Sequence, residues 1–96
     1  KLTHPILPRL IKESDEIIRK MTVSYESKAI GKKIGELKIS SETGVRILAI
    51  RRGSKWIYGP KGEVELKEGD ILICVGPEEG IEELNKLLKG EVEVLE

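Results

Sequence analysis

The segment 70–76, DILICVG, is the most apolar stretch of the chain and limits the fold more than any other feature. A short apolar run bounded by a turn and a glycine is typical of a central, buried strand. The segment that follows has Pro77 at its start, acidic residues in its first turn and Gly90 at its end, which predicts a helix. A buried strand followed by a helix indicates a domain in which helices pack on a sheet.

Periodicity predicts the remaining elements. They are a strand over 17–25 that Arg19 interrupts, a short helix over 27–37, a hairpin of two strands around Gly53, a strand fragment at 64–66 and a final edge strand over 91–96. We therefore predict an α+β fold: a small, mostly antiparallel sheet with two helices. A chain of 96 residues has a modest core, which a dimer interface would help to stabilise.

The first residues form a leader with a different pattern. Pro5 and Pro8 precede apolar residues at helical spacing, which predicts a helix over about 8–16. We interpret 1–18 as a leader or linker helix, or as the tail of an upstream helical domain. Residues 19–96 then form the globular domain.

Composition excludes several classes of function. Acidic and basic residues balance at 17 each and only three residues are aromatic, so we expect no nucleic acid polymer as a partner. Cys74 is the single cysteine and lies in an apolar run, which indicates a buried, unreactive thiol and a reducing, intracellular setting. No apolar run approaches the roughly 20 residues that span a bilayer, so we expect a cytoplasmic protein.

Known catalytic and metal-binding patterns are absent from the sequence. A phosphate loop fails on spacing, because Gly31 and Lys32 are followed by lysine rather than serine or threonine. His4 has no partner at metal spacing. The acidic residues 63–70 suggest either a calcium or acid–base site or, as we prefer, a solvated strand edge. We therefore predict no enzyme activity, no metal and no resident cofactor.

The hairpin carries the basic residues of most interest. Strict alternation places Arg46 and Arg52 on one face of the sheet and Arg51 on the other. Arg46 is suited to bidentate contact with a phosphate, although an arginine extending from a sheet face explains it equally well. Trp56 and Tyr58 share a face, and we interpret them as core or interface packing.

The order of the motifs resembles the C-terminal ligand-binding domain of the TrkA/RCK family, the regulators of potassium channels and transporters. The resemblance rests on GKKIGELKI, TGVRILAIRRG, WIYGP and LKEGDILICVGPEEGIEEL, in that order, and covers about 19–89. No single motif is very specific, but the ordered set at these spacings is a fairly strong signal. The leader HPILPRLIKESDEII further resembles the junction that follows a PhoU-like helical domain in archaeal proteins.

The resemblance implies a homodimer with a cleft between the two copies for a small anionic effector, which in some bacterial relatives is cyclic di-AMP. It also implies a membrane potassium channel or transporter subunit as partner, which would bring the protein to the membrane periphery. By position, the ligand-binding residues are Ile39, Ser40, Arg46, Ile47, Lys55 and Pro60.

Two positions depart from those relatives. They carry an Asp-Ile-Arg-like segment where this chain has Lys38, Ile39 and Ser40, and an asparagine where this chain has Arg46. Two hypotheses follow: a regulatory module that binds an anionic effector, or a structural dimerisation module that binds nothing and links an upstream PhoU-like domain.

Overall fold

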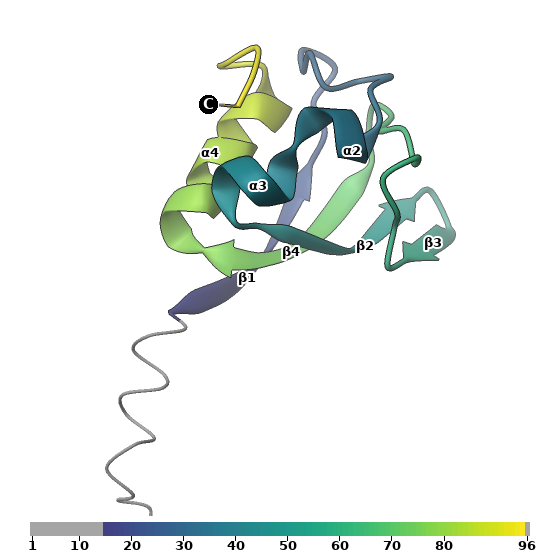
Figure 1. The fold of residues 1–96 in the computed structure, drawn as a ribbon. Coiled ribbons are helices and arrows are strands. Elements are labelled where there is room, and N and C mark those ends of the chain that lie inside the picture. The colour runs from purple at the N-terminus through teal and green to yellow at the C-terminus, as the bar shows by residue number, and fades with distance from the viewer. Residues whose placement is uncertain (1–14, 96) are drawn as a thin grey trace, which may run out of the picture.

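Strand β4 (Ile71–Pro77) lies inside a four-stranded sheet, as its apolar sequence predicts. The computed structural model describes residues 15–95 (Figure 1). The sheet order is β1 (Glu16–Thr22), β4, β2 (Arg46–Arg52) and β3 (Lys55–Tyr58), and all pairings are antiparallel. The α+β prediction is confirmed, as are the central strand and the hairpin.

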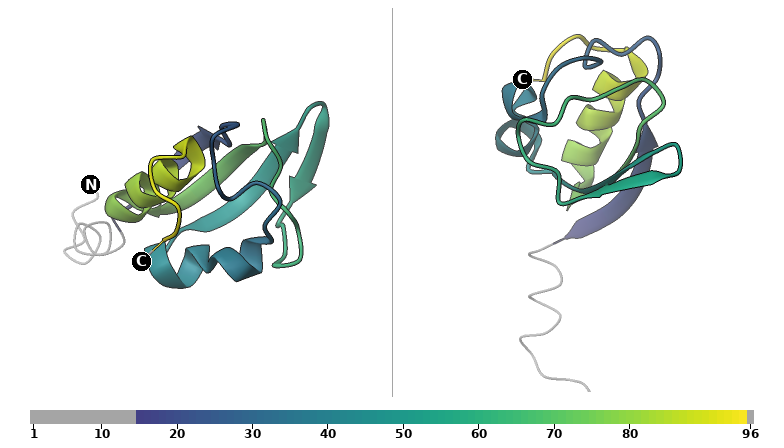
Figure 2. Two further views of the ribbon diagram at one scale, coloured as in Figure 1. Left: turned by 90° about the horizontal axis from the view of Figure 1, so that it is seen from above. Right: turned by 90° about the vertical axis from the view of Figure 1, so that its right-hand side faces the viewer.

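The two faces of the sheet differ. Along β4, Leu72 and Cys74 are fully buried beneath the helices, whereas the alternate residues are only half-buried. Figure 2 shows the helices on one side of the sheet, while no described helix covers the other side. On that open face Ile18 is 69% exposed. An antiparallel sheet commonly has one face on the core and one toward solvent.

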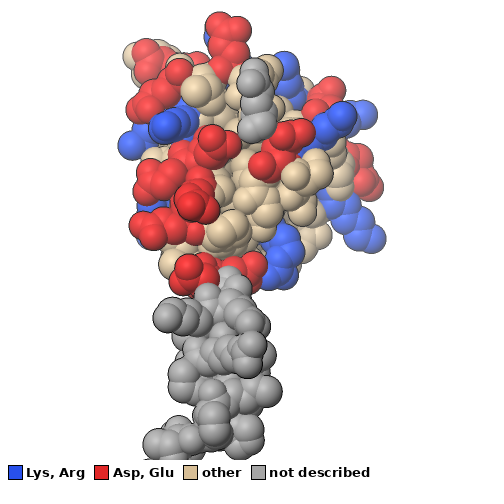
Figure 3. Space-filling view, turned by 60° about the vertical axis from the view of Figure 1, so that its left-hand side comes forward, with Lys and Arg blue, Asp and Glu red and all other residues tan. Residues whose placement is uncertain are grey.

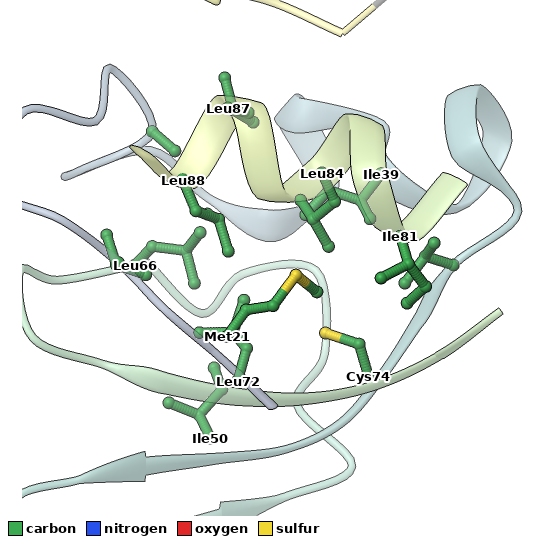
Figure 4. Packing of buried hydrophobic residues seen from close by; sticks show 13 residues of the cluster. Met21, Ile39, Ile50, Leu66, Leu72, Cys74, Ile81, Leu84, Leu87 and Leu88 are labelled. Atoms are coloured by element: carbon green, nitrogen blue, oxygen red, sulfur yellow. The ribbon is translucent and has the colours of Figure 1, made fainter. Parts of the chain in front are cut away.

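Helix α4 (Glu78–Lys89) closes the core over the sheet. It is amphipathic and begins after Pro77 and ends at Gly90, as the sequence predicts. Its inner face buries Gly80, Ile81, Leu84, Leu87 and Leu88. These residues face Met21, Leu72 and Cys74 from the sheet (Figure 4). Each large apolar side chain buried in this way stabilises the fold by roughly 1.5–3 kcal/mol relative to exposure.

The predicted helix over 27–37 is wrong in its first half. Residues 25–26 and 28–31 form turns, and two short helices follow, α2 (Ile34–Leu37) and α3 (Ile39–Thr43). Side-chain hydrogen bonds explain the turns: Ser27 Oγ donates to the Leu87 carbonyl and accepts from the Ala29 amide, at 2.8 and 3.1 Å. Such bonds compete with those of a helix.

The predicted final edge strand over 91–96 is also wrong for the residues that the structure describes. Residues 91–95 form bends on the helix side of the molecule, where the chain end lies in Figure 1. Val92 and Leu95 pack against the buried cluster there, so the apolar residues of this tail reach the core without a strand. The sheet therefore ends at β1 and β3.

The leader prediction lies mostly outside the described residues, because it falls on 1–14. A helix that reaches residue 16 is wrong, since Glu16 begins β1. Arg19 does not interrupt this strand: it pairs with Cys74, and its guanidinium lies 3.7 Å from the Glu82 carboxylate. The division into a leader over 1–18 and a domain over 19–96 stays a prediction. Glu16 to Ile18, which this division assigns to the leader, pair with β4 in the sheet.

Candidate functional site

A β-bulge at Leu48 decides where the arginines of β2 lie. Ile47 pairs with Cys74 and Ala49 with Ile73, so Leu48 is an extra residue without a partner on β4. The bulge reverses the alternation along the strand. Arg46 therefore lies on the open face and Arg52 on the helix face.

The prediction that Arg46 and Arg52 share a face is wrong for this reason. Arg46 pairs with Val75 and Arg51 with Ile71, two residues of β4 that share the open face. Arg46 and Arg51 are thus the two arginines of β2 that share a face.

A groove opens beside the first residues of β2. Its volume is about 370 Å³, toward the small end for ligand sites. Most of its lining is apolar, and Ser40 and Arg46 supply the polar groups. The residues around it are Ile34, Ile39, Ser40, Val45, Arg46, Ile47, Leu48, Gly59 and Pro60. The structure thus brings together five of the six residues that the sequence proposes: Ile39, Ser40, Arg46, Ile47 and Pro60.

The junction of α2 and α3 forms one wall of the groove. Lys38 has a φ of 55°, in the left-handed region, and this sharp turn separates the two helices. Ile39 is therefore directed into the core, while Ser40 is exposed at the groove. The Thr43 hydroxyl closes α3 by donating to the Ile39 carbonyl at 2.6 Å and accepting from the Val45 amide at 3.1 Å.

The loop after β3 forms the opposite wall. The Gly59 amide donates to the Leu48 carbonyl at 2.9 Å, so the bulged residue also fixes the start of this loop. Further along, the Gly35 amide donates to the Gly62 carbonyl at 2.9 Å. A Cβ at Gly35 would lie only 3.2 Å from that oxygen, so the glycine permits the close approach of the two segments.

Arg46 is the only cationic residue among the described residues that line the groove. Its side chain is 60% exposed, and its Nη2 lies 3.5 Å from Oε1 of Glu16 on β1. An exposed pair at this distance contributes about 1 kcal/mol or less. The guanidinium of Arg46 is therefore weakly held and available to a ligand.

Arg52 is held far more tightly. Its Nε and Nη2 donate to the two oxygens of Asp70 at 2.9 and 2.8 Å, and Nη2 also donates to the Glu65 carbonyl at 2.8 Å. Asp70 is 1% exposed and accepts the Lys67 amide as well. The hydrogen bond to Asp70 raises the pKa of Arg52. This arginine fixes the loop to the sheet and is not available to a ligand.

Lys55, the sixth predicted residue, does not line the groove. It begins β3 opposite Arg52, whereas the groove lies beyond the other end of that strand at Gly59 and Pro60.

The interpretation of Trp56 and Tyr58 as core residues is wrong. They stack on each other on the open face, with ring centroids 5.7 Å apart and exposed fractions of 44% and 75%. The register that pairs Trp56 with Arg51 places both rings away from the helices. Interface packing stays a prediction.

The groove contains residues that sequence reasoning missed, namely Ile34, Val45, Leu48 and Gly59. The family pattern gave no reason to single them out. The bulge that brings Leu48 to the groove has no sequence signal of its own, whereas Gly59 directly precedes the predicted Pro60.

The competing sites do not form within the described residues. No group of three or more histidine, cysteine, aspartate or glutamate side chains in 15–95 is placed to hold a metal. The acidic residues of α4 are exposed and form a solvated face, and Figure 3 shows acidic side chains over much of this side of the molecule. Burial raises the pKa of the Cys74 thiol to about 12, as expected for an unreactive cysteine. No described helix is long and apolar enough to cross a membrane.

Known proteins are similar to this chain in sequence and in fold. The family model of the TrkA-C domain matches residues 18–89. A probable potassium channel protein of Methanocaldococcus jannaschii is 34% identical over 77 residues, which are 80% of this chain and 22% of the channel. The chain spans between 14% and 27% of the length of the curated relatives it matches.

Solved structures agree with this match. The RCK_C domain dimer of Streptococcus agalactiae BusR in complex with c-di-AMP has a TM-score of 0.71 and 29% identity, covering 79% of this chain and 94% of that one. The RCK C domain of the potassium transport protein KtrA, also with c-di-AMP, has a TM-score of 0.68 and 30% identity, covering 84% and 93%.

BusR has also been solved in complex with promoter DNA. That structure has a TM-score of 0.70 and 30% identity, covering 76% of this chain and 36% of the BusR chain. A protein that contains this domain can therefore bind DNA. The expectation of no nucleic acid partner stays a prediction for this chain. The family model, the relatives and the fold agree, and the chain belongs to the TrkA-C (RCK-C) domain family, the regulatory domains of potassium channels and transporters.

Proposed function

We propose that the groove binds a small anionic effector, with cyclic di-AMP as the first candidate, and that binding regulates a potassium transport system. The observation that carries the proposal is the grouping of five predicted residues around one groove that has apolar walls and a single weakly held arginine. An apolar wall suits a nucleobase, and a guanidinium suits a phosphate.

The proposal includes a homodimer in which two grooves face each other. Cyclic di-AMP has two identical halves, so a twofold-symmetric dimer would offer each half the same residues. One groove is small for a whole ligand of this kind, which supports a shared site. A ligand that contacts both copies favours the arrangement of the copies that fits it, and this shift is the proposed signal. The BusR dimer and KtrA, both solved with c-di-AMP, support the choice of ligand.

The role of each side chain follows from its place. Arg46 would bind the phosphate, while Ile39, Ile47 and Pro60 would hold the base and Ser40 would offer a hydroxyl. Two of the positions that depart from the relatives, Ser40 and Arg46, lie in this site. No catalytic group is needed, so the proposed domain is a regulator and not an enzyme.

Calorimetry with cyclic di-AMP tests the proposal. Arg46→Ala should weaken binding by about 1–3 kcal/mol, which is roughly 5- to 150-fold, because a charge-assisted contact is lost. Arg51→Ala is the matched control, since Arg51 lies on the same strand and face but outside the groove. Equal affinity in the wild type and Arg46→Ala would remove Arg46 from the site.

Lys55 is tested in the same experiment. It lies outside the groove of its own protomer, so Lys55→Ala weakens binding only if Lys55 reaches the half of the shared ligand that the partner subunit's groove holds. A stable dimer that binds no cyclic di-AMP would favour the alternative function, a structural dimerisation module linking an upstream PhoU-like domain.

A further inference from the structure

We propose that Glu16 competes with the anionic effector for Arg46, so that filling the groove releases the first residue of β1. This inference rests on the proposed function and adds a regulatory contact to it. It follows from the position of Arg46 between two binding partners that lie in opposite directions.

The contact partner of Arg46 lies across the sheet. Arg46 is on β2 and Glu16 is on β1, with β4 between them. Neighbouring strands are about 4.8 Å apart, so the two strands are separated by roughly 10 Å. The side chain of Arg46 must extend over Val75, its partner on β4, to reach Oε1 of Glu16.

The groove lies in the other direction. Pairing between β2 and β3 ends at Ala49 and Tyr58, and the wall formed by Gly59 and Pro60 follows β3. A guanidinium that points across β4 points away from this wall. Arg46 can therefore pair with Glu16 or with a phosphate deep in the groove, but one side-chain position cannot serve both.

The ion pair between Arg46 and Glu16 is weak enough for a ligand to replace it. At 3.5 Å with both side chains partly exposed, 60% for Arg46 and 37% for Glu16, the contact is weak. A ligand phosphate bound by the same guanidinium forms a stronger, charge-assisted contact. Glu16 would thus lower ligand affinity by a small factor without preventing binding.

The position of Glu16 gives the competition a regulatory consequence. Glu16 is the first residue of β1 and pairs with Pro77 at the end of the sheet. Asp15 before it has a φ of 41°, so the backbone turns sharply at this point. Because coupling between two sites is reciprocal, anything that moves this strand end also changes the affinity of the groove.

The test compares Glu16→Gln with Glu82→Gln. Both variants remove one carboxylate charge from an exposed pair with an arginine, but the pair between Glu82 and Arg19 lies on the helix face, away from the groove. At low salt we expect Glu16→Gln to bind cyclic di-AMP about two- to five-fold more tightly than the wild type, and Glu82→Gln to bind like the wild type.

A second measurement needs no ligand. Phenylglyoxal modifies arginines that are free of a carboxylate partner faster than paired ones. Peptide mapping by mass spectrometry should show that Arg46 reacts faster in Glu16→Gln than in the wild type and in Glu82→Gln. Circular dichroism checks that both variants remain folded.

The outcomes separate the two proposals. If Arg46→Ala binds more weakly than the wild type, but both glutamate variants bind like the wild type, the competition is overturned and the proposed function remains. If neither the wild type nor Glu16→Gln binds cyclic di-AMP, both proposals fail. Tighter binding and faster modification of Arg46 in Glu16→Gln alone support the competition.

Discussion

Arg46 and Arg52 stand at the two ends of β2, and each pairs with a carboxylate, yet the two pairs differ in every physical respect. The Arg52 pair is bidentate, at 2.8 and 2.9 Å, and its carboxylate is buried. The Arg46 pair is a single contact at 3.5 Å between partly exposed groups. The same residue type therefore stabilises the fold at one end of the strand and stays available to a ligand at the other.

The largest expected effect comes from removing the buried carboxylate. Asp70→Ala leaves the Arg52 guanidinium and the Lys67 amide without their acceptor, and should lower the free energy of unfolding by about 3 kcal/mol. Urea denaturation measures this change. Glu16→Ala is the control and should change it by less than about 1 kcal/mol. Similar losses in the two variants would contradict the distinction between the pairs.

A deletion tests what the bulge contributes. Without Leu48 the pairs that β2 makes with β4 become consecutive, so Arg46 stays on the open face and Arg52 on the helix face. The deletion removes the carbonyl that accepts the Gly59 amide and one residue that lines the groove. We expect the free energy of unfolding to fall by about 1–2 kcal/mol and cyclic di-AMP to bind more weakly, as measured by urea denaturation and calorimetry. Leu48→Ala, which keeps the bulge and the carbonyl, should largely retain both properties. Unchanged binding in the deletion variant would show that the bulge does not shape the groove.

Replacement by lysine should distinguish the two arginines more finely. Lysine cannot reproduce a bidentate contact, so Arg52→Lys should lower the free energy of unfolding by about 1–2 kcal/mol. Arg46→Lys should change it by less than about 0.5 kcal/mol, because the pair with Glu16 is weak. Thermal unfolding of both variants is the measurement. The comparison fails if Arg52→Lys is as stable as the wild type.

The smallest effect concerns salt. In double-mutant cycles, the coupling between Arg46 and Glu16 should be below about 1 kcal/mol at low salt and should approach zero at 1 M, where the Debye length is about 3 Å. The coupling between Arg52 and Asp70 should persist, because buried pairs are screened less. Equal salt dependence would mean that the pairs are equally accessible to ions.

Local patterns predicted the elements that local forces decide. The apolar run of β4 and the amphipathic helix α4 were predicted from period and capping alone, because each buries one continuous stretch of side chains. The prediction failed where tertiary contacts outweigh the pattern. Ser27 bonds to Leu87, 60 residues away, and this contact replaces a helical turn. Val92 and Val94 alternate with glutamates like a strand, but Val92 and Leu95 are the residues that pack on the core.

The candidate site was predicted in part. Family motifs located Ile39, Ser40, Arg46, Ile47 and Pro60, and the fold gathers these five around one groove. Lys55 stands apart because β3 extends away from the groove. Leu48 could not be predicted, since a bulge depends on how two strands align and leaves no local signal.

The sequence by itself determined the fold class, the family and the residue types of the groove, because these follow from periodicity and the order of motifs along the chain. The tertiary structure alone decided which arginine is available. That choice depends on the extra residue in β2 and on a buried carboxylate 18 positions from Arg52. Both are relations between strands, and the physical state of a charged side chain depends on such neighbours rather than on its own place in the sequence.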